Sequence, residues 1–403
     1  MAEAPGRDRL SALPDDLLHH VMGFLDTRMA VGHLSLLSRR WRYLWASMPR
    51  VDLDDRSVSE RWGSTLLLLR DSYDAQLHTF SLRSSRASQF PYQCWWLRHV
   101  VVGNGIRVLH ITLSGASPFD LPDCVFNSLT LEEIVLSLRI QEQIVPESVC
   151  LPRLKKLRLV NVRLLLSSVA ESLNSGLPEL EELDLDRCCL HRFRISSQTV
   201  KTLSVTACTY VEMHVSAPNV VSLRLTVAGR VKLDAMPFLS RAWVNISGDG
   251  VNRLAPDEHG FLGALSSAQH LELFRFDSLL QVMKQNPATE GPIFGKLKSL
   301  YLGEWLVADF YQPVAYFLNQ APNLASLILD TLKACEENAG LLVPRQASLR
   351  KEPNYKLKLA SASTGLEMLR LRISKGHDAA EFSKMRGLLK EKTKPKEMEV
   401  IWF

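Results

Sequence analysis

Residues 154–159 read LKKLRL and residues 180–185 read LEELDL, so both follow the pattern apolar-x-x-apolar-x-apolar. The pattern returns along most of the chain, with one distorted copy, LSRAWVNI, from Leu239. In a β-strand, alternate side chains point to opposite faces, so the fourth and sixth residues of each unit point the same way. We therefore expect one strand with a single apolar face from each unit. The twelve units begin at Leu77, Ile106, Leu131, Leu154, Leu180, Val200, Val220, Leu239, Ala268, Leu297, Leu324 and Leu366.

The spacing of these units indicates how the strands assemble. Successive units begin 19 to 29 residues apart, except for 42 residues between the last two, and leucine-rich repeats have periods of about 20–29 residues. A single unit cannot bury its apolar residues alone, whereas stacked units share a continuous core. The sequence therefore predicts an α/β fold, with an irregular leucine-rich-repeat solenoid (horseshoe) of about twelve parallel strands over residues 77–373.

Segments between and beyond the units carry other patterns. We expect a helical linker over residues 51–76 that packs on the first repeat, and a C-terminal helix and capping strand over residues 374–403. Asp378 and Glu381 have capping-box spacing for that helix. Residues 195–233 leave too little room for helices and should cross in turns or extended chain. Helices are predicted over residues 59–70, 93–101, 162–173 and 309–319, and a closing strand over residues 397–403.

Composition narrows the class of protein. The chain is 46% hydrophobic and 23% charged, which is typical of a globular protein. Its net charge of +5 argues against a dedicated nucleic-acid binder, and the apolar runs are too short to cross a membrane. Seven cysteines without a C-x-x-C pair indicate a reduced cytoplasmic and/or nuclear protein. We expect no metal and no cofactor; Cys188 and Cys208, which follow predicted strands, should be structural.

The region from Leu10 to Trp45 predicts three short helices with more apolar side chains than they can bury. Pro14 suits the first turn of a helix, and apolar residues then recur at helical spacing as far as Leu25. Thr27 and Ser38 are expected to cap the second and third helices. About 35 residues are too few to bury all of these side chains, so some should face a partner.

Residues 13–31, LPDDLLHHVMGFLDTRMAV, and residues 34–45, LSLLSRRWRYLW, resemble the F-box, the motif that docks on the Skp-type adaptor of a cullin ubiquitin ligase. The resemblance implies an F-box over residues 1–50, with a Skp-type adaptor as its partner and, through the adaptor, cullin. The residues that it places at or behind the adaptor contact are Leu13, Pro14, Leu17, Leu18, Val21, Leu37, Trp41, Leu44 and Trp45.

The repeats carry a second resemblance. Residues 150–159, CLPRLKKLRL, residues 176–190, GLPELEELDLDRCCL, and residues 294–305, FGKLKSLYLGEW, are similar to the repeats of plant F-box/leucine-rich-repeat proteins. The distorted unit at Leu239 and the long gap after Leu324 depart from that family and leave the C-terminal repeat count open. The resemblance implies the substrate-recognition subunit of an SCF-type ubiquitin ligase, which captures a protein target.

Motifs of enzymes fail on spacing. Residues 291–297, GPIFGKL, resemble a phosphate loop, but only three residues separate the glycines where that loop has four. His19 and His20 are adjacent, so on a helix they point about 100° apart and cannot share a metal ion. No catalytic residue is predicted, and enzyme activity is the least favoured function.

Target binding is expected on the concave face of the predicted solenoid. No single charge sign dominates that face, but one group combines aromatic rings with Arg, a composition typical of protein interfaces. Packing against a neighbouring loop is an alternative role for Trp243, because its unit is distorted. The predicted target-binding residues are Arg241, Trp243, His270, Glu272 and Tyr301.

Two other functions stay open from the sequence. The chain could be a leucine-rich-repeat interaction scaffold whose F-box does not lead to ubiquitin transfer. It could also be a sensor whose small-molecule ligand bridges the solenoid and the target, although the sequence indicates no ligand pocket.

Overall fold

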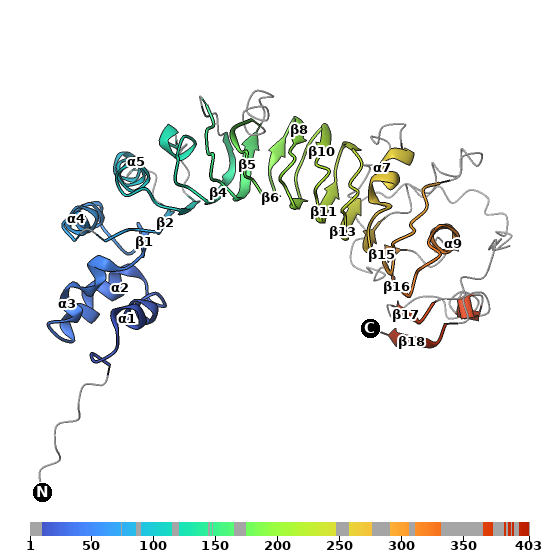
Figure 1. The fold of residues 1–403 in the computed structure, drawn as a ribbon, viewed down its shortest axis with the longest axis horizontal. Coiled ribbons are helices and arrows are strands. Elements are labelled where there is room, and N and C mark those ends of the chain that lie inside the picture. Colours follow the sequence, from blue (N-terminus) through green and yellow to red (C-terminus); the bar gives the residue numbers. More distant parts are fainter. Residues whose placement is uncertain are drawn as a thin grey trace, which may run out of the picture. The chain divides into compact units, whose positions relative to one another are not determined.

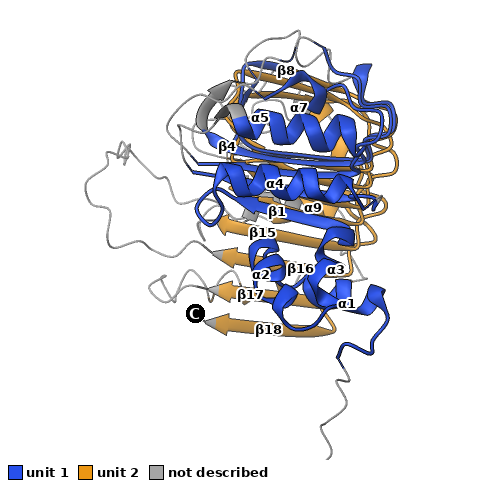
Figure 2. Cartoon of the chain, turned by 90° about the vertical axis from the view of Figure 1, so that its left-hand side faces the viewer, with its two compact units in different colours: residues 1–192 blue, residues 193–403 orange. Residues whose placement is uncertain are grey.

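The computed structural model divides the chain into two compact units, Met1–Arg192 and Phe193–Phe403 (Figure 2). The structure describes residues 10–73, 75–85, 90–114, 121–143, 146, 148–164, 175–246, 258–275, 291–305, 311–331, 366–373, 383, 386–387, 389–390 and 395–402.

Three short α-helices begin unit 1, as the sequence predicts (Figure 1). The predicted caps are wrong. The Asp26 carboxylate, not Thr27, caps α2 by accepting a 2.7 Å hydrogen bond from the Met29 N–H, and Arg40, not Ser38, precedes α3. These elements are α1 (Asp15–Met22), α2 (Thr27–Gly32), the 3-10 turn η1 (Leu34–Leu36), α3 (Trp41–Leu44) and the 3-10 turn η2 (Trp45–Ser47).

The rest of unit 1 is a parallel sheet with strand order β1-β2-β3-β4-β5-β6, and β7 pairs with β5. Residues 51–54, the start of the predicted helical linker, belong instead to a first strand, β1 (Arg50–Asp54). The later part of the linker is helical and forms α4 (Glu60–Asp71). This helix begins after Ser59, because the Ser59 hydroxyl caps it by accepting a hydrogen bond from the Trp62 N–H. The strands are β1 (Arg50–Asp54), β2 (Thr79–Ser84), β3 (Val108–Leu113), β4 (Glu133–Gln143), β5 (Lys156–Leu164), β6 (Glu182–Asp186) and β7 (Cys189–Leu190).

Helices α4 (Glu60–Asp71) and α5 (Phe90–Arg98) lie on one side of this sheet (Figure 1). The predicted helices over residues 59–70 and 93–101 are confirmed. The helix predicted over residues 162–173 is wrong at its start, because Val162 to Leu164 belong to β5; residues 165–174 lie outside the described residues. The elements are α4 (Glu60–Asp71), α5 (Phe90–Arg98), the π-helical turn η4 (His99–Gly103) and the 3-10 turn η5 (Asp123–Val125).

Unit 2 contains a parallel sheet with strand order β9-β11-β13-β14-β15-β16-β17-β18. The distorted unit at Leu239 forms a regular strand, β13, and β16 and β17 are neighbours despite the 42-residue spacing of their units. The closing strand is confirmed as β18. The strands are β9 (Thr202–Thr206), β11 (Ser222–Val227), β13 (Arg241–Ile246), β14 (His270–Phe274), β15 (Ser299–Trp305), β16 (Ser326–Thr331), β17 (Met368–Ile373) and β18 (Glu397–Trp402).

Short connections in unit 2 are extended, as predicted for residues 195–233. They form a second, three-stranded sheet with the order β12-β10-β8. Helix α9 confirms the helix predicted over residues 309–319. The predicted capping box of the C-terminal helix, Asp378 and Glu381, lies outside the described residues. The elements are β8 (Arg192–Ser196), β10 (Glu212–Ser216), β12 (Arg230–Leu233), α7 (Glu258–Leu265) and α9 (Tyr311–Gln320).

Each repeat strand buries its two inward apolar residues, and five of the described repeats turn in the same way. In β5 the side chains of Leu157 and Leu159 are buried, and Arg158 between them faces outward. Among the described residues, five that are not glycine lie in the left-handed region of φ, each five residues after the start of its strand. In two repeats that turn leads directly into Cys188 or Cys208, which are buried; the Cys188 thiol donates to the Leu159 carbonyl. These contacts support a structural role for both thiols. The five residues are Asn161, Arg187, Ala207, Arg275 and Glu304.

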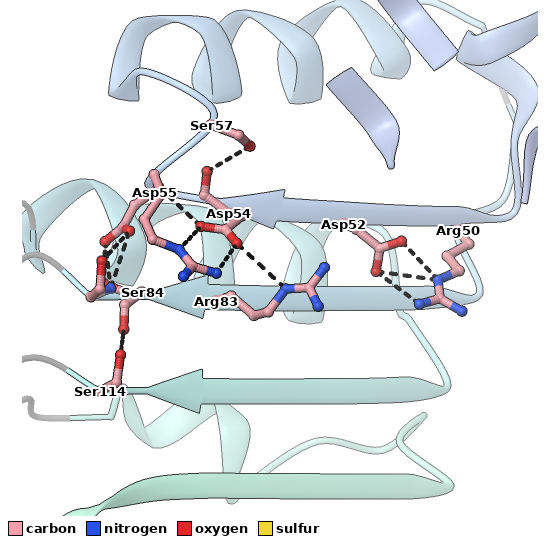
Figure 3. Close-up of polar contacts among 10 residues, drawn as sticks. Arg50, Asp52, Asp54, Asp55, Ser57, Arg83, Ser84 and Ser114 are labelled. Atoms are coloured by element: carbon pink, nitrogen blue, oxygen red, sulfur yellow. Dashed lines mark hydrogen bonds and ion pairs between the residues drawn. The ribbon is translucent and has the colours of Figure 1, made fainter. Parts of the chain in front are cut away.

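A buried carboxylate links the first two strands of unit 1 (Figure 3). The Asp55 side chain, which is 1% exposed, accepts hydrogen bonds from the Ser84 hydroxyl at 2.6 Å and from the Ser85 N–H at 2.9 Å. The Gln93 amide of α5 donates to the same Ser84 hydroxyl. Nearby, Arg56 makes an exposed ion pair. The carboxylate therefore ties β1, β2 and α5 together.

We expect Asp55→Ala to lower the free energy of unfolding by about 2–4 kcal/mol, because the buried Ser84 hydroxyl and the partly buried Ser85 N–H lose their acceptor. Chemical denaturation of the full chain, followed by circular dichroism, measures the change. Arg56→Ala is the matched control and should leave the unfolding midpoint unchanged, because solvent screens its ion pair. Equal midpoints for the two variants would contradict this role of Asp55.

Candidate functional site

The N-terminal helices form a small core of their own. Leu18, Trp41 and Leu44, which the sequence resemblance places at or behind an adaptor contact, lie in this core and are at most 6% exposed. Such side chains support a binding surface from beneath and do not form it. The core residues are Leu18, Met22, Ala30, Trp41, Leu44 and Met48, with Leu13, Leu34 and Trp45 packed against them.

Other apolar side chains of the same helices face solvent. Leu17, Val21 and Leu37 are exposed, as is Pro14, so the structure separates these candidate contacts from the core residues. Phe24 and Leu36 are the most exposed large apolar residues here, at 78% and 82%, and sequence reasoning missed them. Phe24 lies in the turn just after α1, which ends at Met22, so the helical spacing of the apolar residues does not identify it. The exposed set is Leu10, Leu17, Val21, Phe24, Leu25, Met29, Leu36, Leu37 and Tyr43.

Polar contacts hold these helices on the first strand and on α4. The Asp52 N–H of β1 donates to the Thr27 hydroxyl at 2.7 Å. On α4, the Arg70 guanidinium donates to the Trp45 carbonyl at 3.2 Å. Arg70 is buried, and this burial lowers its pKa to about 10. The helices are therefore attached to the sheet of unit 1 through β1 and α4.

Three aromatic rings from successive strands meet on the exposed face of unit 2. The Trp243 and Phe274 ring centroids are 5.3 Å apart, and so are those of Phe274 and Tyr301. Gly303 makes room for them, because a Cβ at this position would lie 2.7 Å from ring carbons of both Phe274 and Tyr301. We call Trp243, Phe274 and Tyr301 the aromatic cluster. Phe274 was missed from the sequence because the repeat pattern of this unit, residues 268–273, ends one residue before it.

Strand register brings the five predicted target-binding residues together. Arg241 pairs with His270, and Glu272 lies between Trp243 on one side and Tyr301 on the other. Trp243 packs on the Phe274 ring, and the Arg224 guanidinium lies 5.3 Å from the centroid of the Trp243 ring.

A polar network positions the third ring of the cluster. The Tyr301 hydroxyl donates a 2.6 Å hydrogen bond to the Asp330 carboxylate, which also pairs with Arg372 at 3.1 Å. Burial raises the pKa of Tyr301, and the bond to Asp330 raises it further. The hydroxyl therefore stays protonated and serves as a donor that orients the ring.

The described residues offer little support for other classes of site. Within them, no group of three or more His, Cys, Asp and Glu side chains could hold a metal ion. Among the helices in the described ranges, none is long and apolar enough to cross a membrane.

A helical domain with exposed apolar side chains, followed by parallel repeat strands, is the arrangement of an F-box/leucine-rich-repeat protein. The F-box domain model matches residues 10–52, and the At1g61320/AtMIF1 leucine-rich-repeat domain model matches residues 71–363. The chain therefore belongs to the F-box/leucine-rich-repeat family.

Relatives in Arabidopsis thaliana resemble most of the chain. It is 29% identical to F-box/LRR-repeat protein At4g14103, over 81% of this chain and 92% of the relative. It is 31% identical to putative F-box protein At1g58310, over 81% of this chain and 74% of the relative. FBD-associated F-box protein At4g10400 is 26% identical, over 86% of this chain and 83% of the relative.

Gly303→Ala should disrupt the aromatic cluster. The added methyl group collides with Phe274 and Tyr301, and we expect the free energy of unfolding to fall by about 1–3 kcal/mol. Chemical denaturation of the full chain measures this change. Gly295→Ala is the control, because a Cβ there meets nothing within 4 Å. If both variants unfold at the same denaturant concentration, the cluster does not depend on the space at Gly303.

Proposed function

We propose that this chain is the substrate-recognition subunit of an SCF-type cullin ubiquitin ligase. The F-box binds a Skp-type adaptor, and through it cullin, while the exposed face of the leucine-rich repeats captures a protein target. The observation that carries the proposal is the apolar surface that remains exposed on the folded F-box, above all Leu17, Phe24, Leu36 and Leu37.

The size of this surface supports a protein partner. Burying a fully exposed leucine or phenylalanine side chain contributes about 1.5–3 kcal/mol. Leu17, Phe24, Leu36 and Leu37 are each at least half exposed, so a partner that covers them gains several times that contribution. The buried residues Leu18 and Trp41 hold α1 and α3 in place beneath that surface.

The chain acts by proximity in this proposal. A target held by the repeats and an adaptor held by the F-box are joined through one polypeptide, which raises the effective concentration of target lysines at the ligase. The side chains of the chain itself make and break no covalent bond. Such a role belongs in the cytoplasm and/or the nucleus.

Target capture is assigned to the aromatic cluster and its neighbours. Trp243 and Tyr301 present large rings with limited side-chain freedom, and Arg241, His270 and Glu272 surround them with polar groups. Buried aromatic anchors inside a polar rim are typical of the residues that dominate protein interfaces.

An interaction scaffold that does not lead to ubiquitin transfer is the second candidate. It shares both surfaces and differs only in the outcome for the target. Measuring the half-life of a captured protein with and without proteasome inhibition separates the two, because only the ligase subunit shortens that half-life in a proteasome-dependent way.

Leu17→Asp should weaken binding of the full chain to a Skp-type adaptor at least about 100-fold, because it places an unpaired charge in an apolar interface. Leu17 is 50% exposed, so the F-box keeps its fold. Calorimetric titration of the purified chain with the adaptor measures the affinity.

Leu68→Asp provides the control for that experiment. Leu68 lies on α4 with a similar exposure, outside the F-box, and the same substitution there should leave adaptor affinity unchanged. If the wild-type chain does not bind the adaptor at micromolar concentration, or if Leu17→Asp binds as well as the wild type, the F-box assignment of this surface fails.

A further inference from the structure

Three neighbouring strands of unit 2 expose no acidic side chain. Strands β9, β11 and β13 are parallel and in register, so their outward residues form rows on one face. Within these strands the outward positions carry hydroxyl groups, two arginines, one ring and one amide. They are Thr202, Ser204, Thr206, Ser222, Arg224, Thr226, Arg241, Trp243 and Asn245.

Arginines on or just after the following strands differ from Arg224 and Arg241, because each forms an ion pair with a carboxylate of the same chain. Arg275 pairs with Glu304 at 2.5 Å, and Arg370 pairs with Glu399 at 2.5 Å. Arg372 pairs with Asp330 at 3.1 Å. The positive charge on that part of the sheet is therefore compensated within the chain.

Arg224 and Arg241 have no such compensation. Within the part of the chain that the structure describes, neither has a carboxylate at ion-pair distance, and both side chains are exposed. They lie on adjacent strands, because Ser222 pairs with Arg241 and Arg224 pairs with Trp243. Adjacent parallel strands are about 4.8 Å apart and each residue adds about 3.3 Å along a strand, so the Cα atoms of Arg224 and Arg241, offset by two residues, lie about 8 Å apart. Two long arginine side chains can converge on one carboxylate over that distance.

The aromatic cluster continues directly from this basic surface. The Arg224 guanidinium lies 5.3 Å from the centroid of the Trp243 ring, and that ring packs on Phe274. Beyond Trp243, the exposed Glu272 repels a second negative charge. A ligand that fits this face therefore carries its negative charge on the β9 side and its apolar group on the β14 side.

We propose that the face formed by β9, β11, β13, β14 and β15 binds an acidic segment of a protein. An Asp or Glu carboxylate of that segment pairs with Arg224 and Arg241, and a neighbouring large apolar side chain packs on the aromatic cluster. Charge complementarity selects this occupant, because β11 and β13 offer two exposed arginines, β9 and β11 offer hydroxyl donors, and no outward residue of these three strands is acidic. That this segment belongs to a ubiquitination target rests on the proposed function.

Selection from random twelve-residue peptides displayed on phage, with the full chain as bait, tests the proposal. We expect enriched peptides to combine Asp or Glu with a large apolar residue a few positions away. The Arg224→Ser, Arg241→Ser double variant should bind a synthetic copy of the most enriched peptide about 10- to 100-fold more weakly in fluorescence anisotropy. Enrichment of basic or uncharged peptides, or no enrichment, would overturn the proposal.

A matched double variant controls for net charge. Arg275→Ser with Arg370→Ser removes the same two charges, but both of these side chains are already paired within the chain. This variant should keep the wild-type peptide affinity, and equal losses in the two double variants would show nonspecific attraction and overturn the site. A dimer of the wild-type chain that the Arg224→Ser, Arg241→Ser variant abolishes would instead assign the face to a second copy.

Adaptor binding by the same preparation keeps the two proposals separate. If the chain selects acidic peptides but does not bind a Skp-type adaptor, the proposed ligase function fails and the acidic-segment site stands. If it binds the adaptor but selects no acidic peptide, the site fails and the ligase function stands.

Discussion

One constraint underlies this structure: a single repeat has no means of burying its own apolar strand residues. Leu157 and Leu159 of β5 are buried because the neighbouring repeats and their backbone turns cover them. Stacking fixes a common register, and a common register places outward residues of successive strands in rows. The aromatic cluster of unit 2 follows from this, because its rings come from different repeats and meet only through the register of their strands.

The same stacking leaves an open edge at the first strand, where unpaired backbone groups favour association with other chains. In unit 1 the F-box helices lie against this edge. The Thr27 hydroxyl accepts the Asp52 N–H, and Arg70 donates to the carbonyl of Trp45. The F-box is thereby attached to the repeats by hydrogen bonds while its apolar surface around Leu17 and Leu36 stays exposed.

Rows of outward residues also decide where charge is available. In unit 1, Lys156 pairs with Glu182 and Arg158 pairs with Asp184, at 3.2 and 3.3 Å, so neighbouring repeats neutralise each other. Exposed pairs of this kind contribute little to stability, but they remove charge from the surface that a partner meets. Arg224 and Arg241 of unit 2 have no carboxylate at ion-pair distance among the described residues, so their positive charge stays available to a partner.

The sequence by itself determined the repeat, its twelve strands and the F-box, because apolar spacing and short motifs are local properties of the chain. It misplaced β1, the cap of α2 and the start of the helix after β5, where a strand pairing or a competing side chain overrides local preference. The tertiary structure alone divided the F-box residues into a core, with Leu18 and Trp41, and an exposed surface, with Phe24. It alone placed Phe274 between two rings over Gly303, because contacts between repeats depend on register and packing space rather than on residue spacing within one repeat.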